Sequence, residues 1–326
     1  MAASAVLKRE REWSRAVFSS MRRVALPEML SSLPRLLCTV CMAAPPPTSK
    51  PIYSVGRRVH LPAIAHATLE HDPNRPRTII VGDIHGCLDE LKALLAACEY
   101  DARTTRVVLV GDLVNKGPFS AESVKFVRES GFLCVRGNHD DAVLFAWEER
   151  EAERHDGGAP LDASDKYAYT DDFSAHDVQF LRSLPHTLRL PFASAIVVHA
   201  GLVPGVPLVE QEAAAMITMR NLLPNGTDTA AATAGRRRWT HTSEGAAWGA
   251  QWRPEEDEAA LAGISHVIFG HDAKRGLQQH AHATGLDTGA CYGNGLSALV
   301  LPEKRIVKVP SLRVYSDPKS PKQPKK

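Results

Sequence analysis

The sequence predicts an α/β domain built on a mostly parallel, buried sheet. Short apolar runs alternate with segments that carry apolar residues at helical spacing, and this alternation is typical of βαβ units. Each run also ends in a polar cluster. The runs begin the stretches "TIIVGDIHG", "RVVLVGDLVNKGP", "FLCVRGNHD", "ASAIVVHAGLVPG" and "SHVIFGHD". The chain has 326 residues, of which 44% are hydrophobic, so it is long enough for one large domain or two small ones.

Two helices are expected between the first three strands. Residues 88–98, "LDELKALLAAC", repeat apolar side chains at helical spacing. Residues 120–131 form the second helix, which we expect Ser120 to cap and Gly131 to end. The charged residues 142–184 predict helices packed over the domain, and residues 285–311 predict one or two closing hairpins.

The ends of the chain differ from its middle in composition. We expect an extension over residues 1–75, a folded domain over 76–312 and a basic tail over 313–326. The basic, Ser-containing first 50 residues fit an organelle transit segment or a disordered extension equally well. The apolar piece "LLCTVCMAA" is too short to span a bilayer, so no transmembrane segment is expected. A cytoplasmic and an organellar location both stay open.

Charge and cysteine usage exclude some classes of protein. The formal net charge is only +2, so no global field indicates a nucleic-acid partner. Four of the six cysteines, Cys87, Cys98, Cys134 and Cys291, fall in or beside predicted elements and fit buried, reduced thiols. Cys38 and Cys41 make a CxxC, but no second pair follows at zinc-finger spacing.

The polar side chains at the strand ends indicate a metal site. In open α/β sheets ligands bind outside the carboxyl ends of the strands. A single histidine there is usually a hydrogen-bonded structural residue, but five polar strand ends in one chain are hard to assign to chance. Carboxylate, imidazole and amide groups suit a mixed nitrogen and oxygen site, and the absence of Cys disfavours structural zinc. The candidate ligands are Asp83, His85, Asp112, Asn138, His199 and His271.

The number of ligands fits two ions better than one. Asp83, His85 and Asp112 can hold the first ion, and Asp112 can bridge to a second ion held by Asn138, His199 and His271. Two divalent ions roughly 3.5–4 Å apart can clamp a phosphoryl group and deprotonate a bridging water. Mn, Fe, Zn, Mg and Co all accept such ligands, so the identity of the metal stays open.

The motifs around these residues resemble a known family. "GDIHG", "GDLVNKGP", "GNHD", "HAGLVPG" and "GHD" occur in the order typical of the calcineurin-like metallophosphoesterases. Within the phosphoprotein-phosphatase-like branch, "NKGPFS", "GHDAKRGLQ" and "GLDTGACYGNGLSAL" are most similar to the ApaH diadenosine tetraphosphatases and the eukaryotic ApaH-like phosphatases. The resemblance implies a β-sandwich flanked by helices, with a dimetal site at the sheet edge.

The resemblance also implies roles for residues beside the metals. His139 would protonate the departing oxygen. Lys116 stands where protein phosphatases have a phosphate-binding Arg, and Arg136 and Arg220 are further candidates for binding phosphate.

One departure from the protein phosphatases concerns the partner of His139. Asn115, which we also place among the phosphate-binding residues, stands where those enzymes have an acidic residue that charges the catalytic His. Asp140, which we place in the catalytic group, or Asp141 is expected to compensate.

These patterns predict a metal-dependent phosphohydrolase that uses in-line attack by a hydroxide bridging two metals. Diadenosine polyphosphates, inorganic polyphosphate and capped RNA ends are the expected substrates; a Ser/Thr phosphoprotein phosphatase is the alternative, and a metal-free scaffold is a third hypothesis. Trp248 and Trp252 pack on the core or stack a nucleobase, and both interpretations stay open. "GRRRW", residues 235–239, is expected to be a solvated loop or a polyanion site.

Overall fold

The computed structural model describes residues 59–155, 165–224, 237–254 and 263–317. The chain divides into two compact units, Met1–Ser49 and Lys50–Lys326, and every described residue lies in the second unit. The expectations for Cys38, Cys41 and a transit segment therefore fall outside the described residues, as does Arg236 of the basic loop. No helix among the described ranges is long and apolar enough to cross a membrane.

The first sheet has five strands in the order β14-β13-β2-β3-β4. Its strands β2, β3 and β4 are parallel, whereas β13 runs antiparallel to both β2 and β14. In register, Ile80 of β2 lies opposite Val108 of β3 and Leu299 of β13. The strands are β2 (Arg77–Val81), β3 (Thr105–Leu109), β4 (Leu133–Cys134), β13 (Leu296–Leu301) and β14 (Arg305–Val309).

The second sheet has six strands in the order β1-β5-β6-β10-β12-β11. Here β6, β10 and β12 run parallel, and β5 pairs with β6 antiparallel. The strands are β1 (His66–Thr68), β5 (Thr187–Leu190), β6 (Ala195–Val198), β10 (His266–Phe269), β11 (Gln278–Gln279) and β12 (Ala283–Gly285). A third, small sheet has the order β8-β7-β9, formed by β7 (Asn221–Leu222), β8 (Trp239–Thr240) and β9 (Ala246–Ala247).

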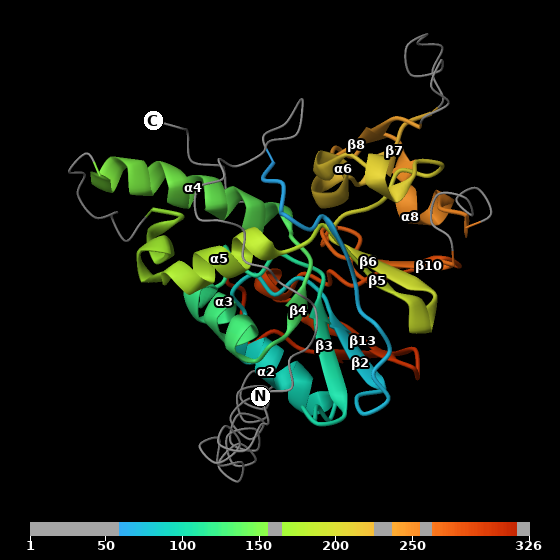
Figure 1. Ribbon diagram of the computed structural model, residues 1–326, viewed down its shortest axis with the longest axis horizontal. Coiled ribbons are helices and arrows are strands. Elements are labelled where there is room, and N and C mark those ends of the chain that lie inside the picture. Colours follow the sequence, from blue (N-terminus) through green and yellow to red (C-terminus); the bar gives the residue numbers. More distant parts are fainter. Residues whose placement is uncertain (1–58, 156–164, 225–236, 255–262, 318–326) are drawn as a thin grey trace, which may run out of the picture. The chain divides into compact units, whose positions relative to one another are not determined.

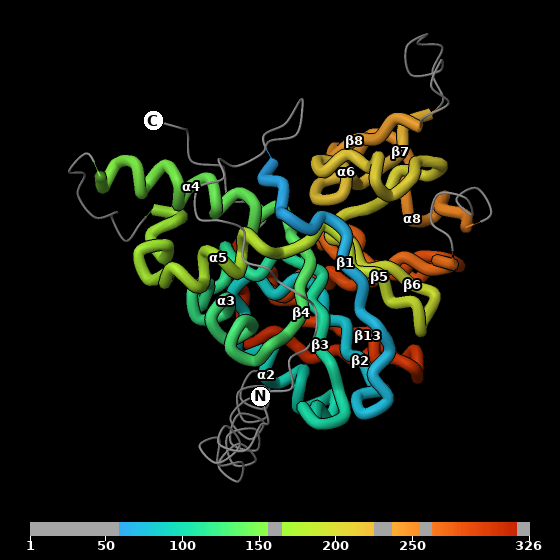
Figure 2. The backbone as a smooth tube through the Cα atoms, in the orientation of Figure 1, coloured from blue at the N-terminus to red at the C-terminus, as the bar shows by residue number. Residues whose placement is uncertain are grey.

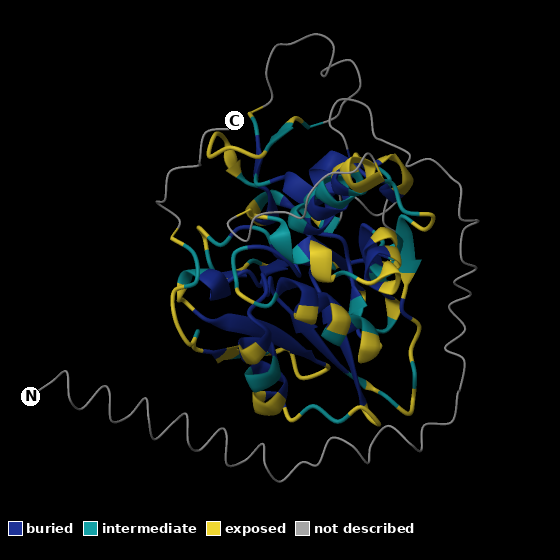
Figure 3. Cartoon of the chain, turned by 90° about the vertical axis from the view of Figure 1, so that its left-hand side faces the viewer, coloured by how far each residue is buried: buried dark blue, intermediate teal, exposed yellow. Residues whose placement is uncertain are grey.

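The two large sheets are stacked and share a core. Successive side chains of a strand point to opposite faces, so Ile79 packs among the helices while Ile80 packs between the sheets. On the second sheet Val197 faces the same inter-sheet core and Val198 faces outward into another apolar cluster. Each inner strand is therefore buried on both faces, which explains its continuous apolar run. Figure 3 shows these strands in the colour of buried residues.

Helices cover the outer faces of the sandwich (Figures 1 and 2). The first sheet is covered by α2 (Leu88–Ala97), α3 (Ser120–Glu129), α4 (Asn138–His155) and α5 (Ala175–Ser183). The second is covered by α6 (Ala213–Thr218) and α8 (Trp248–Gln251). Short 3₁₀ helices are η2 (Ala168–Asp172), η3 (Pro191–Ala193), η4 (Leu208–Glu210) and η5 (Ala290–Tyr292).

The β-sandwich flanked by helices is confirmed, and the mostly parallel single sheet is wrong. The error has a physical cause: strands buried on both faces look alike whichever direction their neighbours run. The hairpin β13–β14 and the pairing β5–β6 make both sheets mixed. Ser120 also departs from expectation, since it is the first residue of α3 and its Oγ accepts the backbone N–H of Asn115 at 2.9 Å.

The folded region begins before residue 76, where the motifs first become regular. The backbone N–H of His60 donates to Asp141 at 2.9 Å, and β1 pairs with β5. At the other end the hydroxyl of Tyr315 donates to Glu90 of α2 at 2.8 Å, so residues 313–317 pack on the domain. The four thiols of Cys87, Cys98, Cys134 and Cys291 are free and buried, as expected.

Candidate functional site

The carboxyl ends of strands from both large sheets meet at one edge of the sandwich. Asp83, Asp112 and Asn138 follow β2, β3 and β4 of the first sheet, while His199 and His271 follow β6 and β10 of the second. The backbone joins these ends directly, because Gly270 N–H donates to the His199 carbonyl at 2.8 Å and His85 N–H donates to the Asp112 carbonyl at 2.8 Å. The structure therefore brings all the candidate ligands to one place.

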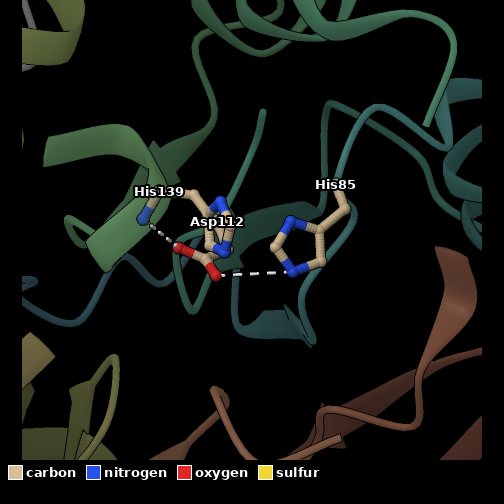
Figure 4. A group of neighbouring side chains, drawn as sticks. All are labelled: His85, Asp112 and His139. Atoms are coloured by element: carbon tan, nitrogen blue, oxygen red, sulfur yellow. Dashed lines mark hydrogen bonds and ion pairs between the residues drawn. The ribbon is translucent and has the colours of Figure 1, made fainter. Parts of the chain in front are cut away.

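Asp112 lies at the centre of this cluster, and its two carboxylate oxygens face different partners. Oδ2 lies 3.4 Å from Nε2 of His85, and Oδ1 lies 3.4 Å from Nε2 of His199 (Figure 4 shows His85). Oδ1 also accepts the backbone N–H of His139 at 2.9 Å. His199 in turn lies 3.2 Å from Oδ1 of Asn138. A carboxylate between two groups of nitrogen and oxygen atoms is the arrangement that a shared ligand requires.

Two groups of possible ligand atoms converge, and Asp112 belongs to both. One group is His85, Asp112 and His139, the other is Asp83, Asp112 and His199, and within each the ligand atoms lie within 4.8 Å of one another. His271 borders the second group, with its ring centroid 5.1 Å from that of His199. Imidazole nitrogens and carboxylate oxygens with no thiolate fit a divalent cation of the Mn, Fe, Zn, Mg or Co kind.

The turns that carry these side chains have unusual backbone angles. Non-glycine residues seldom adopt positive φ, and such strain gathers at functional sites. Among the described residues eight do so, and five of the eight belong to this site. They are His85, Asp112, Asn115, Lys116 and His271, with φ between 45° and 72°. The tight turns redirect the chain at the strand ends and leave the side chains aimed at one another.

Glycines beside the ligands let the loops approach closely. A Cβ atom at Gly137 would overlap the carboxylate and backbone nitrogen of Asp112, and one at Gly270 would overlap the carboxylate of Asp83. The glycine in "GNHD" and the glycine in "GHD" are therefore required by contact with a carboxylate.

Three of the histidines direct one ring nitrogen to a backbone carbonyl. Nδ1 of His85 lies 2.9 Å from the Val114 carbonyl, and Nδ1 of His199 lies 2.8 Å from the Val110 carbonyl. Nε2 of His271 lies 3.1 Å from the Thr218 carbonyl. Nε2 of His271 also faces the donor Nε of Arg220, at 3.3 Å. A carbonyl can only accept, so Nδ1 of His85 and Nδ1 of His199 carry the proton, and Nε2 of each of these two rings keeps its lone pair. This second hydrogen bond is the one that metal-binding histidines make.

Burial sets the charge state of the cluster. It raises the pKa of Asp112 to about 6, and burial together with the charges of Asp287 and Asp112 raises the pKa of Asp83 well above its usual value. Burial lowers the pKa of His199 to about 4 and that of His85 well below its usual value. Neutral imidazoles with free lone pairs beside crowded carboxylates favour a bound cation, which would relieve the repulsion among the carboxylates.

His139 differs from the other three histidines in its partner. Its Nδ1 lies 3.0 Å from Nδ2 of Asn115, and Oδ1 of Asn115 accepts from the hydroxyl of Tyr169 at 2.8 Å. Both ends of the Asn115 amide are therefore engaged. The side chain contacts His139 and is not free to bind phosphate, which corrects the role expected for Asn115.

Asp140 and Asp141 do not take the place of the missing acidic residue. The carboxylate of Asp140 accepts the backbone N–H groups of Asp112, Leu113 and Gly137 at 2.8, 2.8 and 2.9 Å. Asp141 accepts from the backbone of His60 on the other side of the helix. Asp140 is fully buried, and it holds the loop that presents Asp112, so its expected part in orienting the His139 ring is wrong.

The three cations proposed for phosphate binding separate into two kinds. Arg136 is completely buried and donates to the carbonyls of His60, Leu181 and Arg182, so it is a structural residue and not a phosphate ligand. Lys116 reaches the site, with Nζ 2.7 Å from Nε2 of His85. Arg220 reaches it as well, donating to the carbonyl of His271 at 3.1 Å.

The two tryptophans lie in the core behind the second sheet. Trp248 is 2% exposed and Trp252 is 0% exposed, and the Trp248 ring lies 4.7 Å from that of Phe269. No nucleobase can reach either face, so the packing interpretation holds and the stacking interpretation is wrong.

Three residues of the site were not expected from the sequence. Asp287 follows β12 and is buried beside Asp83. Its motif "GLDTG" offered a signal, because an Asp directly follows a short apolar run. Tyr292, whose ring lies 5.2 Å from Nζ of Lys116, and Tyr169 offered none. Both lie in short 3₁₀ helices, η2 and η5, whose sequences carry no periodic apolar pattern.

Comparison with known proteins defines the class. Residues 76–275 match the family model of the calcineurin-like phosphoesterases. The chain belongs to this family and is a hydrolase that acts on phosphorus bonds, and the resemblance seen in the motifs is confirmed. Metal-ligating groups of the kind that such enzymes use for divalent ions are present at the strand ends.

The chain is also similar to individual proteins of this family. The symmetrical bis(5'-nucleosyl)-tetraphosphatase of Coxiella burnetii (strain Dugway 5J108-111) is 30% identical over 286 residues, which cover 73% of this chain and 94% of the relative. The enzyme of the same name from Psychromonas ingrahamii is 28% identical, covering 70% of this chain and 95% of the relative. The solved "Crystal structure of a putative diadenosine tetraphosphatase" is 33% identical with a TM-score of 0.62, covering 76% of this chain and 98% of that one.

Proposed function

We propose that this chain is a two-metal phosphohydrolase that cleaves phosphoanhydride bonds in dinucleoside polyphosphates. The observation that carries the metal assignment is the position of Asp112, whose two oxygens face His85 on one side and His199 on the other. The relatives named as tetraphosphatases support the choice of substrate.

Two sets of residues would hold the ions. Asp83, His85 and Asp112 form the first set, and Asp112 is shared with Asn138, His199 and His271. The ring nitrogens that do not face a backbone carbonyl, Nε2 of His85 and His199 and Nδ1 of His271, are the ones that would ligate. When bound, two divalent ions polarise the phosphoryl oxygens and lower the pKa of a water held between them.

The remaining polar groups would act on the substrate. Lys116 and Arg220 stand beside the cluster and would offset the charge that builds up on the non-bridging phosphate oxygens. His139 would donate a proton to the oxygen that departs when the phosphorus–oxygen bond breaks. The attacking water supplies the oxygen that replaces the leaving group, and its proton leaves with solvent.

A cavity beside Lys116 gives room for a substrate larger than a phosphate monoester. It has a volume of about 350 Å³ and is lined by Lys116, Gly117, Pro118, Arg313, Val314 and Tyr315. Two cationic side chains on one cavity suit a chain of phosphates. Arg313 and Tyr315 come from the segment after the last strand, so this end of the domain would contact the part of the substrate beyond the scissile bond.

The test is hydrolysis by the purified full-length chain with added Mn, Co, Mg or Zn. Diadenosine tetraphosphate, polyphosphate, capped RNA and a phosphopeptide are compared. We expect diadenosine tetraphosphate to give the highest kcat/KM. Asp112→Asn should lose at least about 10³-fold in kcat, whereas Asp89→Asn, an exposed carboxylate on α2, should keep full activity.

Other outcomes would contradict one part of the proposal or another. Preference for the phosphopeptide would replace the substrate and leave the metal site in place. Preference for polyphosphate or capped RNA would keep the anhydride chemistry and change the substrate class. Full activity of Asp112→Asn would overturn the shared-ligand assignment.

A further inference from the structure

We propose that Tyr169 is a positioning residue that acts through Asn115 to hold His139 in the tautomer with its proton on Nε2. This inference rests on the proposed function, in which His139 donates a proton to the leaving oxygen. It assigns to Tyr169 and Asn115 together the task that an acidic residue performs in protein phosphatases.

The three side chains form a continuous chain of hydrogen bonds. The hydroxyl of Tyr169 lies 2.8 Å from Oδ1 of Asn115, and Nδ2 of the same amide lies 3.0 Å from Nδ1 of His139. Asn115 is 1% exposed, and its own N–H is held by Ser120 at 2.9 Å. Because the backbone of Asn115 is fixed, the amide has only two orientations, related by a half-turn that exchanges oxygen and nitrogen.

The phenol selects between these orientations. Burial raises the pKa of Tyr169, so the hydroxyl keeps its proton and must donate it. With Oδ1 toward the phenol, the hydroxyl has an acceptor. With the amide turned over, Nδ2 would face the phenol, and the phenol proton would have no acceptor in the part of the chain that the structure describes. A buried donor without a partner loses its hydration and gains nothing in return, so the first orientation is strongly favoured.

The amide orientation then decides the tautomer of His139. An amide Nδ2 can only donate, so Nδ1 of His139 must accept, and the proton of the neutral ring lies on Nε2. The neighbouring histidines show the opposite arrangement. His85 and His199 each donate from Nδ1 to a carbonyl, which leaves Nε2 as a lone pair.

This difference separates His139 from the metal ligands, although it lies near them. The ring centroids of His85 and His139 are 4.8 Å apart, and distance alone groups both with Asp112. A nitrogen that ligates a metal must have a free lone pair, whereas a nitrogen that protonates a leaving group must carry a proton. The Val114 carbonyl takes the Nδ1 proton of His85 and leaves its Nε2 with a lone pair. The chain from Tyr169 through Asn115 places the proton of His139 on Nε2.

The need for a third residue follows from the chemistry of asparagine. A carboxylate has two equivalent oxygens and accepts the Nδ1 proton of a histidine in either orientation, and its negative charge favours the imidazolium, in which Nε2 is protonated as well. An amide has one donor end and one acceptor end, so a histidine beside it is correctly oriented only if another group fixes the amide. Tyr169 is itself fixed, because its ring packs 5.7 Å from that of Phe173 and against the core under α3 and α5.

The main test is a double-mutant cycle on the metal-loaded, full-length chain with diadenosine tetraphosphate as substrate. The variants are Tyr169→Phe, Asn115→Asp and the pair. We expect Tyr169→Phe to lower kcat by about 10-fold or more with KM unchanged, because a misdirected donor removes general-acid catalysis. In the Asn115→Asp background the same change should cost less than about 2-fold, because a carboxylate needs no orientation. Tyr167→Phe, on the same turn, is the matched control.

The cycle distinguishes positioning from packing. A role of Tyr169 in stability alone predicts the same loss in both backgrounds, and that result would overturn the proposal. So would a Tyr169→Phe variant with unchanged kcat. Aspartate tolerates a left-handed backbone nearly as well as asparagine. The Asn115→Asp variant is therefore expected to fold like the unaltered chain.

A spectroscopic arm reads the tautomer directly and does not depend on activity. In the full chain loaded with Mg or Zn and labelled with ¹⁵N at histidine, the signal absent from His139→Gln is assigned to His139. We expect its Nε2 to appear protonated and its Nδ1 unprotonated, with the two tautomers mixed in Tyr169→Phe. A proton on Nδ1 in the unaltered chain would overturn the inference even if every phosphate substrate is hydrolysed. If none is hydrolysed, the proposed function fails while this arm still decides the tautomer.

Discussion

Of the three basic residues proposed for phosphate binding, two reach the ligand cluster, and the third is buried and stabilises the fold. Lys116 and Arg220 reach the ligand cluster, whereas the guanidinium of Arg136 is enclosed by backbone carbonyls and lies 3.6 Å from Asp141. An Arg one residue before a "GNHD" motif looks like a phosphate ligand in the sequence. In the structure it ties the start of α4 to the end of α5 and to the segment that precedes β1.

Replacing Arg136 is therefore expected to affect stability and not substrate binding. Arg136→Met leaves Asp141 without one of its two cationic partners, His60 being the other, and three carbonyls without their donor. We expect a loss of about 3–5 kcal/mol in the free energy of unfolding, measured by urea denaturation. The KM of the remaining folded enzyme should stay within about 2-fold of the original. Arg103→Met, with a side chain 83% exposed, is the control. A well-folded variant with a strongly raised KM would restore the phosphate-binding role.

At the scale of elements, the site depends on how closely the loops after the strands can approach. The loop after β10 passes against the carboxylate that follows β2, and Gly270 makes this contact possible. A Cβ there would overlap Asp83 and lie 2.6 Å from Cγ2 of Val110. The two loops come from different sheets, so this contact also depends on how closely the two sheets approach each other at this edge.

Gly270→Ala is expected to weaken metal binding more than folding. The added methyl group displaces Asp83, and displacement of a ligand or its support lowers metal affinity by about 10–100-fold. Bound metal per chain after dialysis against buffered Mn measures the effect. Gly276→Ala has open space around the new methyl group and only its left-handed backbone to strain, with φ of 65°. It should lose some stability and keep its metal. Equal metal loss in the two variants would contradict the prediction.

The segment before β1 is fastened to α4 through a buried histidine. Nε2 of His60 lies 3.1 Å from Glu148, and Nδ1 lies 3.3 Å from Asp141. Arg136 and Arg182 face the same two carboxylates. Burial lowers the pKa of His60, but the hydrogen bonds and charges of Asp141 and Glu148 outweigh it, so the pKa is raised overall.

The raised pKa of His60 predicts how stability depends on pH. The folded state binds the proton more tightly than the unfolded state, so the stabilisation is complete below the ordinary value of about 6.5 and is lost as pH rises above it. Unfolding in urea from pH 5.5 to 9 should show the original chain exceeding His60→Gln by about 1–3 kcal/mol at the acid end, with the difference shrinking toward pH 9. His176→Gln, at an exposed position, is the matched control for removal of a histidine. A difference constant over this range would show that His60 acts by packing alone.

At the scale of the whole folded unit, the site joins two sheets that share an apolar core. Asp83, Asp112 and Asn138 come from the first sheet, and His199 and His271 come from the second. A bound cation would therefore link the two layers of the sandwich. Burial, together with repulsion from neighbouring carboxylates, raises the pKa of Asp83 and Asp287, and the charge of a cation would oppose both effects.

Metal binding is accordingly expected to stabilise the protein. A ligand at 100 times its Kd adds about 2.7 kcal/mol to the free energy of unfolding, which corresponds to a rise of roughly 5–10 °C in Tm for a chain of this size. Thermal unfolding with Mn, Co, Mg or Zn, and again after a chelator, measures the shift. Asp112→Asn should abolish most of it. A Tm that none of the four metals changes would contradict the two-metal assignment.

The strands that carry the metal ligands, the types of ligand and their order along the chain can be predicted from the sequence alone, whereas β1, β5, β7, β8 and β9 are not expected from it. Buried strands need continuous apolar runs, and polar residues directly after such runs must lie at the strand ends, so Asp83, Asp112 and His199 are identifiable from the pattern. The parallel direction of β2, β3 and β4 follows from the helices between them.

Tertiary packing, in contrast, determines which polar groups face the site and which support it. Arg136, Asp140 and Trp248 carry the right chemistry for catalysis or binding, yet their functional atoms are used up by backbone groups or enclosed in a core. Tyr169 reaches the site from the short 3₁₀ helix η2, whose sequence carries no periodic pattern. The spacing of residues in the sequence indicates local backbone geometry. The direction and the partners of a side chain depend instead on contacts between residues far apart in the chain. These contacts exist only once the two sheets have packed together.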